Sequence, residues 1–385
     1  MSTYLKTNNK IDCTNCQICM IVCPVSCIRS VEDNFGFAYP AIDKEKCINC
    51  NMCVKSCHEQ SIFKTEAINR RIALKNNCEK EIMTSTSGGV FIELAKYTLS
   101  IGGYVCGAII DNNLEVCHIL SNKLTDIEQM KKSKYVDSNI KDCFQEIKSL
   151  INKGIYVLFS GTPCQVAAII QYIGRNKYLI TCDFLCSGCS SPIVFKKYIH
   201  YLEDEYKSKL ISFDFRTKSL CWVHPAFEID FENEKVIIKH EDSAYYWLFA
   251  NGASNKPCCS NCRYIENKIS DITLGDCWGI NENDKIYDEF GVSYININTQ
   301  KGEEIFDEIS MNFTYRELFN GEYPQYRQIH KPTDIVDKEL FFRYIQNHNF
   351  LETTKIFLPW QYKENFISEK IRQIKKELFR RGFIK

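Results

Sequence analysis

The sequence lacks both a net charge and a long apolar run. Its 385 residues include 48 basic and 48 acidic side chains, whereas proteins that bind nucleic acid usually show a basic excess or a basic face. No window comes near the roughly 18 uninterrupted apolar residues of a membrane span, and residues 1–12 lack the apolar stretch of a signal peptide. We therefore expect a cytoplasmic protein with no nucleic-acid partner.

Cysteine is absent from residues 300–385 and crowded elsewhere. Ten of the 22 cysteines precede residue 79. A protein held together by disulfides is normally short, because a long chain can bury enough core without them. This chain is long and 45% hydrophobic. In a reducing cytoplasm its crowded cysteines indicate metal or redox chemistry.

The N-terminal cysteines form two runs with the spacing C-x2-C-x2-C-x3-C. Pro24 follows the first run, and His58 stands at the same place after the second. In two-cluster ferredoxins, three cysteines of each run bind one 4Fe-4S cluster and the fourth binds the other cluster. Structural zinc sites, which commonly use two C-x2-C halves, fit this spacing less well. The predicted ligands are Cys13, Cys16, Cys19 and Cys57 for the first cluster, and Cys47, Cys50, Cys53 and Cys23 for the second.

Residues 8–66 resemble a bacterial two-cluster ferredoxin module. The likeness rests on both runs and on Phe35-Gly36-Phe37 and Tyr39-Pro40 between them. Cys27 lies outside the pattern, and we expect it to be a small buried residue. A module of this kind carries one electron at a time, so it implies a redox partner protein such as ferredoxin or another oxidoreductase subunit.

A larger domain follows a polar segment, residues 67–84, that we expect to be a linker. Beyond it, apolar residues recur at helical spacing in some windows and as short strand-like runs in others. This alternation predicts an α/β domain over residues 85–330 with at least partly parallel strands. Helices are predicted to begin after Gly89, near Ile140 and at Pro163, and strands are predicted at 104–110, 155–159 and 178–185.

Two turns of this domain are candidates for binding phosphate. Ser87-Gly88-Gly89 and Ser160-Gly161-Thr162 each offer a hydroxyl and unobstructed backbone N–H groups at the start of a predicted helix, where the helix dipole favours anions. The same residue types are also ordinary helix caps, so both roles stay open. Neither turn is a Walker loop or a G-x-G-x-x-G, so the fingerprint of a nicotinamide-type Rossmann domain is missing.

A second group of cysteines runs through this domain. It contains the pairs Cys186/Cys189 and Cys259/Cys262, and each pair has the C-x2-C spacing of half a metal site. Cys182 lies in an apolar predicted strand, and we expect it to be part of the core. The others, among them Cys164, Cys258 and Cys277, could equally be apolar core.

Several short motifs follow one another between Ser85 and Gly279. They are Thr86-Ser87-Gly88-Gly89-Val90-Phe91, Ser133-Lys134-Tyr135-Val136, Ser160-Gly161-Thr162-Pro163-Cys164-Gln165, Cys186-Ser187-Gly188, Ser191-Pro192, Phe215-Arg216-Thr217-Lys218, Cys259-Ser260-Asn261-Cys262 and the segment 270–279. In these motifs the chain resembles the coenzyme F420 hydrogenase/dehydrogenase beta-subunit family. With the ferredoxin module in front, the resemblance covers most of the sequence.

The resemblance implies an iron–sulfur flavoprotein. Members of the family hold FAD near an iron–sulfur cluster and pass electrons between iron–sulfur carriers and a two-electron acceptor. By resemblance, FAD would be lined by Ser87, Gly88, Gly89, Lys134, Tyr135, Ser160, Gly161 and Thr162, and a third 4Fe-4S cluster would be held by Cys164, Cys186, Cys259 and Cys262. Lys134 suits a pyrophosphate, although a solvated lysine is the alternative.

The chain departs from the family at two places. The usual Cys-His-Gly turn is replaced by Cys186-Ser187-Gly188 and is followed by an additional cysteine, Cys189. Cys277 stands where an aromatic residue usually precedes Trp278-Gly279. A rival ligand set, in which Cys189 replaces Cys164, therefore stays open and could even bind zinc.

Residues 331–385 are expected to be a helical tail. Its aromatic-rich part, Glu339–Tyr344, is predicted to pack on the main domain. Residues 363–385 carry eight basic and three acidic side chains, a net charge of +5, and one apolar helical face. Such a helix can lie on an anionic membrane surface, bind a partner protein or pack on its own domain. The tail resembles that of family members from bacterial surface-polysaccharide gene clusters.

The expected fold is α+β, with a ferredoxin-like domain at 1–66, an α/β flavin-binding domain and the tail. The expected function is an oxidoreductase in which electrons pass from the ferredoxin-type clusters through the third cluster to FAD and on to a small-molecule acceptor. The acceptor would be the deazaflavin coenzyme or, in an anaerobic bacterium, a nucleotide-sugar or lipid-linked glycan intermediate. A non-catalytic electron-transfer or docking subunit and a structural zinc protein are the alternatives.

Overall fold

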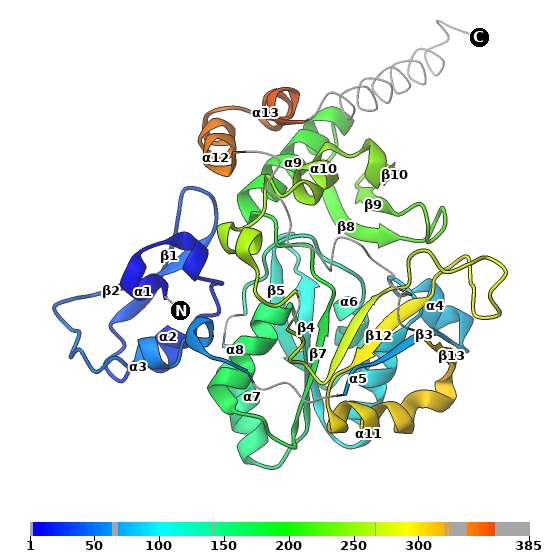
Figure 1. The fold of residues 1–385 in the computed structure, drawn as a ribbon. Helices are drawn as coiled ribbons and strands as arrows, with labels where there is room; N and C mark the ends of the chain where they lie inside the picture. Colours follow the sequence, from blue (N-terminus) through cyan, green and yellow to red (C-terminus); the bar gives the residue numbers. More distant parts are fainter. Residues whose placement is uncertain are drawn as a thin grey trace, which may run out of the picture.

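The computed structural model describes residues 3–63, 68–140, 142–265, 267–319, 322 and 337–358. These residues form an N-terminal module with a two-stranded sheet, a large domain built on an eight-stranded sheet, and a smaller layer built on a three-stranded sheet. Figure 1 shows the N-terminal module beside the large sheet, and the three-stranded sheet above one end of that sheet.

The N-terminal module consists of short helices and one hairpin. Strands β1 (Ile28–Glu32) and β2 (Ala38–Ile42) pair antiparallel. Phe37 and Tyr39 are buried in an aromatic cluster that belongs mostly to the smaller layer, so the module is anchored on the rest of the chain. Its helical elements are α1 (Tyr4–Thr7), η1 (Lys10–Asp12), α2 (Ile18–Ile21), α3 (Met52–Lys55) and η2 (His58–Gln60).

The eight-stranded sheet has the order β13-β3-β12-β11-β7-β6-β4-β5. Strands β11, β7, β6 and β4 are parallel neighbours, and antiparallel strands flank them on both sides. The strands are β3 (Arg70–Asn76), β4 (Tyr104–Ile110), β5 (Val116–Ser121), β6 (Val157–Ser160), β7 (Leu179–Phe184), β11 (Ile272–Asp276), β12 (Ser293–Ile297) and β13 (Phe313–Glu317). The predicted partly parallel sheet is therefore confirmed.

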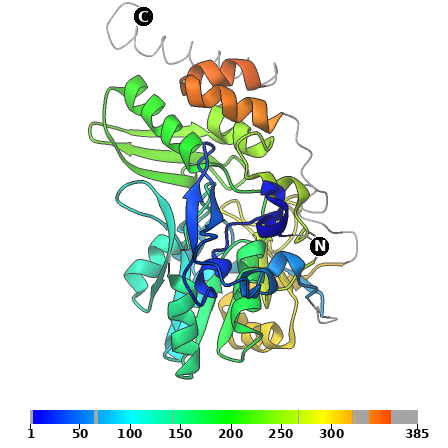
Figure 2. The ribbon, with the colours of Figure 1, turned by 90° about the vertical axis from the view of Figure 1, so that its left-hand side faces the viewer.

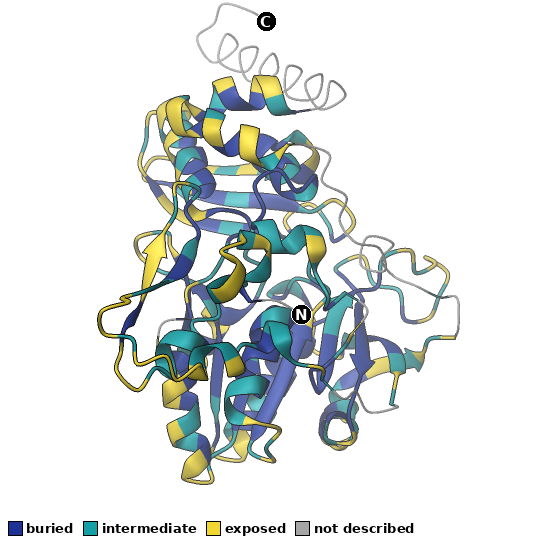
Figure 3. Ribbon diagram, turned by 60° about the vertical axis from the view of Figure 1, so that its left-hand side comes forward, coloured by how far each residue is buried: buried dark blue, intermediate teal, exposed yellow. Residues whose placement is uncertain are grey.

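Helices cover both faces of the large sheet, as burial of both faces of a parallel sheet requires. One apolar cluster packs α5, α6 and α11 on one face, and another packs α7 and α8 on the other. Figure 3 shows the strands between them as largely buried. The helices are α4 (Glu79–Met83), α5 (Val90–Ser100), α6 (Leu124–Met130), α7 (Cys143–Asn152), α8 (Pro163–Ile173) and α11 (Gln300–Ile309).

The expected linker at residues 67–84 is wrong, because residues 70–76 form β3 inside the sheet. This strand pairs antiparallel with β12 on one side and with β13 on the other, and its residues Ile72, Ala73 and Leu74 are fully buried. Three apolar residues among charged ones are too short a local signal for a strand. Pairing with strands far along the chain decides it, so the large domain begins before residue 85.

The smaller layer joins the other parts of the chain through one aromatic cluster. Its strands pair antiparallel in the order β10-β9-β8, and the cluster also includes Phe37 of the N-terminal module and Phe341 of the tail. The elements are α9 (Pro192–Tyr206), β8 (Leu210–Thr217), β9 (Ala226–Phe231), β10 (Lys235–Lys239), η3 (His240–Asp242), α10 (Ala244–Ala250), η4 (Pro257–Asn261), α12 (Lys338–Asn347) and α13 (Phe350–Phe357), whereas η5 (Ser310–Asn312) joins α11 to β13 in the large domain.

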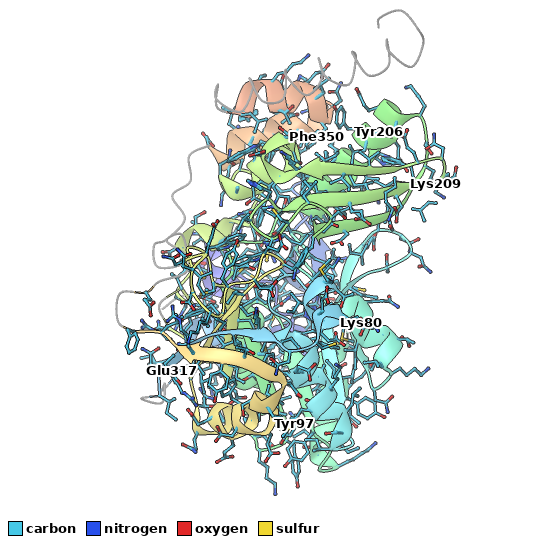
Figure 4. All side chains as sticks on the ribbon, turned by 90° about the vertical axis from the view of Figure 1, so that its right-hand side faces the viewer. Lys80, Tyr97, Tyr206, Lys209, Glu317 and Phe350 are labelled. Atoms are coloured by element: carbon cyan, nitrogen blue, oxygen red, sulfur yellow. The ribbon has the colours of Figure 1, made fainter. Side chains whose placement is uncertain are left out.

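The tail helices α12 and α13 lie on the smaller layer and close to the N-terminal module (Figure 2). Phe342 stacks on Phe35 of the module, with 4.5 Å between ring centroids. Figure 4 shows Phe350 and Tyr206 on the smaller layer, far from Tyr97 on the large domain. The predicted basic helix at 363–385 lies outside the described residues. Within the described ranges, no helix is long and apolar enough to cross a membrane.

Candidate functional site

The two N-terminal cysteine runs repeat one backbone conformation. Asn15 and Asn49, just before the second cysteine of each run, have φ +59° and +55°, and Gln17 and Asn51, just after it, have φ +64° and +59°. Left-handed residues other than glycine are uncommon, and asparagine tolerates this conformation best. The repeat curls each run in the same way, as the binding of one cluster by each run requires.

The four cysteines predicted for the first cluster surround one cavity. Cys13, Cys16, Cys19 and Cys57 line it together with Cys53. Burial, together with the nearby Cys57, raises the pKa of the Cys13 thiol to about 11. Binding of a metal displaces such protons. Four thiols around one hollow, one of them from the other run, fit a 4Fe-4S cluster with an exchanged fourth ligand.

The second predicted ligand set lies toward the outside of the module. Cys50 is exposed, and burial raises the pKa of Cys53, with Cys50 and Cys23 adding to the shift. Cys27 is buried, as expected. Its sulfur lies 3.5 Å from the sulfur of Cys23. A thiol outside the predicted set therefore contacts one of the predicted ligands of the second cluster.

The third predicted ligand set is brought together from three separate elements. Cys164 lies in the first turn of α8, Cys186 follows β7, and Cys259 and Cys262 lie in and just after η4. Burial raises the pKa of the Cys164 thiol well above its usual range, and the other three thiols raise it further. The folded chain thus gathers four cysteines that lie far apart in the sequence.

Two additional cysteines lie at the same place. Cys189 forms side-chain hydrogen bonds with Cys186 and Cys259, which raise its pKa, and Cys258 forms one with Cys259. The rival ligand Cys189 therefore belongs to the same group of thiols as Cys164. The choice between the two ligand sets stays a prediction.

The spacing of these thiols is relevant to the zinc alternative. Within the described parts of the chain, no three His, Cys, Asp or Glu side chains are grouped to hold a single metal ion. Thiolates on one tetrahedral zinc would stand about 3.8 Å apart, given Zn–S bonds of about 2.3 Å. Each thiolate of a 4Fe-4S cube binds a different iron and stays farther from the others. Cys189 forms hydrogen bonds with both Cys186 and Cys259, so the choice between a cube and zinc stays a prediction at this place.

The predicted turns lie at one edge of the large sheet together with the third cysteine set. Asn76, at the end of β3, donates its backbone N–H to the carbonyl of Gly88 at 2.8 Å. The Ser160 turn follows β6, and Cys186 follows the parallel strand β7. Ligands of open α/β sheets bind beyond the carboxyl ends of the strands. The topology therefore places the candidate site at this edge.

The first predicted phosphate turn uses its donors within the protein. Gly88 donates its N–H to Ser293 Oγ at 2.8 Å, and the Ser87 hydroxyl donates to the carbonyl of Val292 at 2.8 Å. A Cβ on Gly88 would lie 2.5 Å from the carbonyl oxygen of Leu74. Gly89 has φ +82° and caps α5. The expectation of unobstructed groups is wrong for Ser87 and Gly88, because the turn packs against β3 and β12.

The second turn is a helix cap. Gly161 donates its N–H to the carbonyl of Cys182 at 3.2 Å, and Thr162 donates its N–H to Gln165 Oε1 at 2.9 Å, as in a capping box. The Ser160 carbonyl oxygen lies 3.2 Å from His118 Nε2. The N–H groups of Gly161 and Thr162 are therefore engaged as well, and a role of this turn toward FAD stays a prediction.

Lys134 is half-buried, and its ammonium bonds within the protein. Its ammonium donates to the carbonyls of Gln129, Lys131 and Lys132, and burial lowers its pKa to about 7. Tyr135 stacks on Phe249, with 4.6 Å between ring centroids. These two predicted FAD residues therefore have structural partners inside the protein.

Sequence reasoning missed a buried polar group at the end of β11. Trp222 Nε1 donates to Asp276 at 3.0 Å, and Arg216 donates to the same carboxylate at 3.4 Å. Trp222 also stacks on Trp278, with 4.6 Å between ring centroids and 4° between planes. The motifs at 215–218 and 270–279 carry three of these residues. Their spacing gave no hint that β8 of the smaller layer meets β11 here.

Comparison with known proteins agrees with this organisation. Residues 156–317 match the family described as the C terminus of the coenzyme F420 hydrogenase/dehydrogenase beta subunit, and residues 12–72 match the "4Fe-4S dicluster domain". The chain is 26% identical over 324 residues to the coenzyme F420-dependent sulfite reductase of Methanocaldococcus jannaschii, over 80% of this chain and 48% of that protein.

Two further similarities are more limited. The chain is 34% identical over 65 residues to NADH-quinone oxidoreductase subunit I of Pelobacter propionicus, over 15% of this chain and 35% of that protein. It spans about half or less of the length of these curated relatives. A chain of the F420-reducing NiFe hydrogenase complex from Methanosarcina barkeri is similar at a TM-score of 0.45 and 15% identity, over 83% of this chain and 96% of that chain.

The two family matches fall on the two cysteine-rich regions. Residues 12–72 contain both N-terminal runs, and residues 156–317 contain Cys164, Cys186, Cys259 and Cys262. Residues 156–317 therefore belong to the family of C-terminal domains found in the beta subunits of coenzyme F420 hydrogenases and dehydrogenases, and residues 12–72 belong to the 4Fe-4S dicluster domain family.

Proposed function

We propose that the protein is an iron–sulfur oxidoreductase that passes electrons between a partner protein and a two-electron organic acceptor. One observation carries the proposal: Cys16 of the first run packs in the same apolar cluster as Cys164 and Cys262 of the large domain. The two cysteine-rich regions are therefore in contact. Both curated relatives are redox proteins by name, which supports the same function class.

The predicted ligand cysteines lie along a path that runs from the exposed side of the N-terminal module to the edge of the large sheet. Cys50 is exposed, Cys16 is half-buried at the contact with the large domain, and Cys164 lies in the first turn of α8, after the Ser160 turn. Clusters bound by these thiolates would supply one-electron transfer. The protein would supply their separation, burial and electrostatic surroundings.

A redox partner protein is part of the proposal. Beside the second predicted ligand set, Val25, Ile48 and Met52 are exposed at 38%, 59% and 44%. Exposed apolar side chains that gather in one place mark contact surfaces. Ferredoxin or another oxidoreductase subunit would bind here, next to the exposed Cys50.

The acceptor that we propose is the deazaflavin coenzyme. Support comes from the family of residues 156–317 and from the name of the M. jannaschii relative. A glycan or nucleotide-sugar acceptor rests only on the resemblance of the tail. The tail segment 363–385, which would also make any peripheral membrane contact, lies outside the described residues.

FAD belongs to the proposal as the mediator between one-electron and two-electron carriers. Its support is the family resemblance and the gathering of the predicted turns at the carboxyl edge of the sheet. The polar groups of Ser87, Gly88, Gly161, Thr162 and Lys134 bond within the protein. They do not fit a pyrophosphate cradle as they stand, so a flavin would rest on other groups at this edge.

Metal and flavin analysis of anaerobically purified protein tests the proposal. We expect about twelve irons per chain, from three clusters of four irons, and one flavin. Zinc in place of iron would refute the redox function. About eight irons would remove the third cluster, and iron without flavin would contradict only the FAD part.

A non-catalytic electron-transfer subunit is the second candidate. It is favoured by the coverage of the M. jannaschii relative, of which this chain matches 48%, because the reaction centre of such a protein can lie in its other part. A turnover assay of the isolated chain with reduced ferredoxin and coenzyme F420 distinguishes the two candidate functions. Catalytic reduction of the coenzyme supports an enzyme, whereas reduction of the clusters without turnover supports a subunit.

A further inference from the structure

His58 takes the place of the proline that follows the first cysteine run, and its side chain is fully buried. It is the first residue of η2, a position at which proline is well tolerated. Burying an imidazole costs free energy unless its nitrogens find partners. The first run has Pro24 at the corresponding position, so the cysteine pattern by itself does not require histidine here.

Both ring nitrogens of His58 have partners in other cysteine-rich segments. Nε2 lies 2.8 Å from Thr14 Oγ1, next to the predicted ligand Cys13. Nδ1 lies 2.5 Å from the Tyr264 hydroxyl, two residues beyond the predicted ligand Cys262. A neutral imidazole donates at one ring nitrogen and accepts at the other, so one ring can bond to both hydroxyls.

The segment that contains Tyr264 is itself held in place by packing and hydrogen bonds. Tyr264 is 2% exposed and packs in the apolar cluster that contains Cys16 and Cys164. The next residue back, Arg263, donates to the carbonyl of Glu59 at 2.7 Å, so both residues that follow Cys262 are bonded to η2. A buried network whose polar groups are all paired favours one arrangement.

We propose that His58 and Tyr264 are positioning residues that set the separation between the first N-terminal cluster and the third cluster. The inference rests on the proposed function, since it requires both clusters. Electron transfer between bound centres falls steeply with their separation, so the contacts that fix this separation affect the rate. Proline at position 58 lacks both ring nitrogens and would leave Thr14 and Tyr264 without this link.

Two substitutions and one matched control test the inference. His58→Pro restores the residue of the first run at a backbone position that accepts it. Tyr264→Phe removes only the hydroxyl and keeps the buried ring. Ser61→Ala is the control, because it removes another hydrogen bond between the module and the large domain, from Ser61 Oγ to Gln171 Oε1 at 2.7 Å, and leaves the histidine in place.

Each protein is purified anaerobically, assayed for iron and reduced with dithionite. Electron paramagnetic resonance then measures the magnetic interaction between the reduced clusters, and rapid freezing measures the rate at which the third cluster is reduced. All four proteins should hold the same iron. In His58→Pro and Tyr264→Phe the magnetic interaction should weaken and the rate should fall severalfold, whereas Ser61→Ala should match the wild type.

A Tyr264→Phe protein with full iron, unchanged magnetic interaction and unchanged rate would overturn the positioning role, even if His58→Pro failed to fold. Wild-type protein that holds only two clusters would overturn the proposed third cluster, and the positioning role with it. The two failures are therefore distinguished by the iron content of the wild type.

Discussion

Lys256 and Asp137 form a buried ion pair, with the ammonium nitrogen 2.6 Å from the carboxylate oxygen. The same ammonium donates to the carbonyl of Thr14 at 3.2 Å and lies 5.6 Å from the centroid of the Phe37 ring. Lys256 also immediately precedes η4, which carries Cys258 and Cys259. One buried cation thus connects the third cysteine group to the N-terminal module.

Lys256→Met should lower the free energy of unfolding by about 3–5 kcal/mol, because it leaves the Asp137 carboxylate buried without its partner. Urea denaturation of the anaerobically purified protein measures the change. The double variant Lys256→Met, Asp137→Leu should recover much of the loss, since no lone charge remains buried. A loss below about 1 kcal/mol in the single variant would show that the pair contributes no more than an exposed one.

Cys164→Ser and Cys189→Ser distinguish the two ligand sets of the third cluster. If the family set is right, Cys164→Ser should lose about four of roughly twelve irons, and Cys189→Ser should keep them all. Iron analysis and electron paramagnetic resonance of both variants measure this. Cys182→Ser is the control, because Cys182 is 1% exposed in the sheet core and should not affect iron content. Loss of iron from Cys189→Ser alone would assign the cluster to the rival set.

His240 should make the protein less stable as the pH falls below neutrality. Burial lowers its pKa to about 3, with Arg216 adding to the shift, whereas the unfolded value is about 6.5. Between these values the unfolded chain binds a proton that the folded chain does not. The contribution of neutral, buried His240 to the free energy of unfolding is therefore fully present above about pH 6.5. It is lost as the pH falls toward 3, at about 1.4 kcal/mol per pH unit.

Urea denaturation between pH 7.5 and 5 checks this dependence. His240→Gln cannot titrate, so its stability should fall with decreasing pH less steeply than that of the wild type, by about the slope of one buried histidine. Equal slopes in the two proteins would show that His240 does not differ in proton binding between the folded and unfolded chains.

Local patterns predicted much of the large domain. The helices at Val90 and Pro163 and the strand at Tyr104–Ile110 begin at or within a few residues of the predicted positions, because apolar periodicity and small capping residues act within one element. The β3 strand was missed, since its pairing partners Ser293–Ile297 and Phe313–Glu317 lie far along the chain.

The candidate site was predictable to the extent that it depends on spacing. Two runs of C-x2-C-x2-C-x3-C are local geometry, and the structure places Cys57 with Cys13, Cys16 and Cys19 around one cavity, as the exchanged-ligand rule predicts. The predicted phosphate donors depend on what packs against them. Gly88 donates to Ser293, far along the chain, and Lys134 donates to the carbonyls of its own loop. The pattern of residue types predicted neither acceptor.

The sequence by itself determined the kind of chemistry, because cysteine spacing fixes which thiols one short segment can present to one centre. The tertiary structure decided how the parts are joined. It brought Cys164, Cys186, Cys259 and Cys262 together from three elements, and it gave His58 its partners Thr14 and Tyr264. Packing and hydrogen bonding between distant segments made those choices, since a buried polar group must be paired wherever its partner lies in the chain.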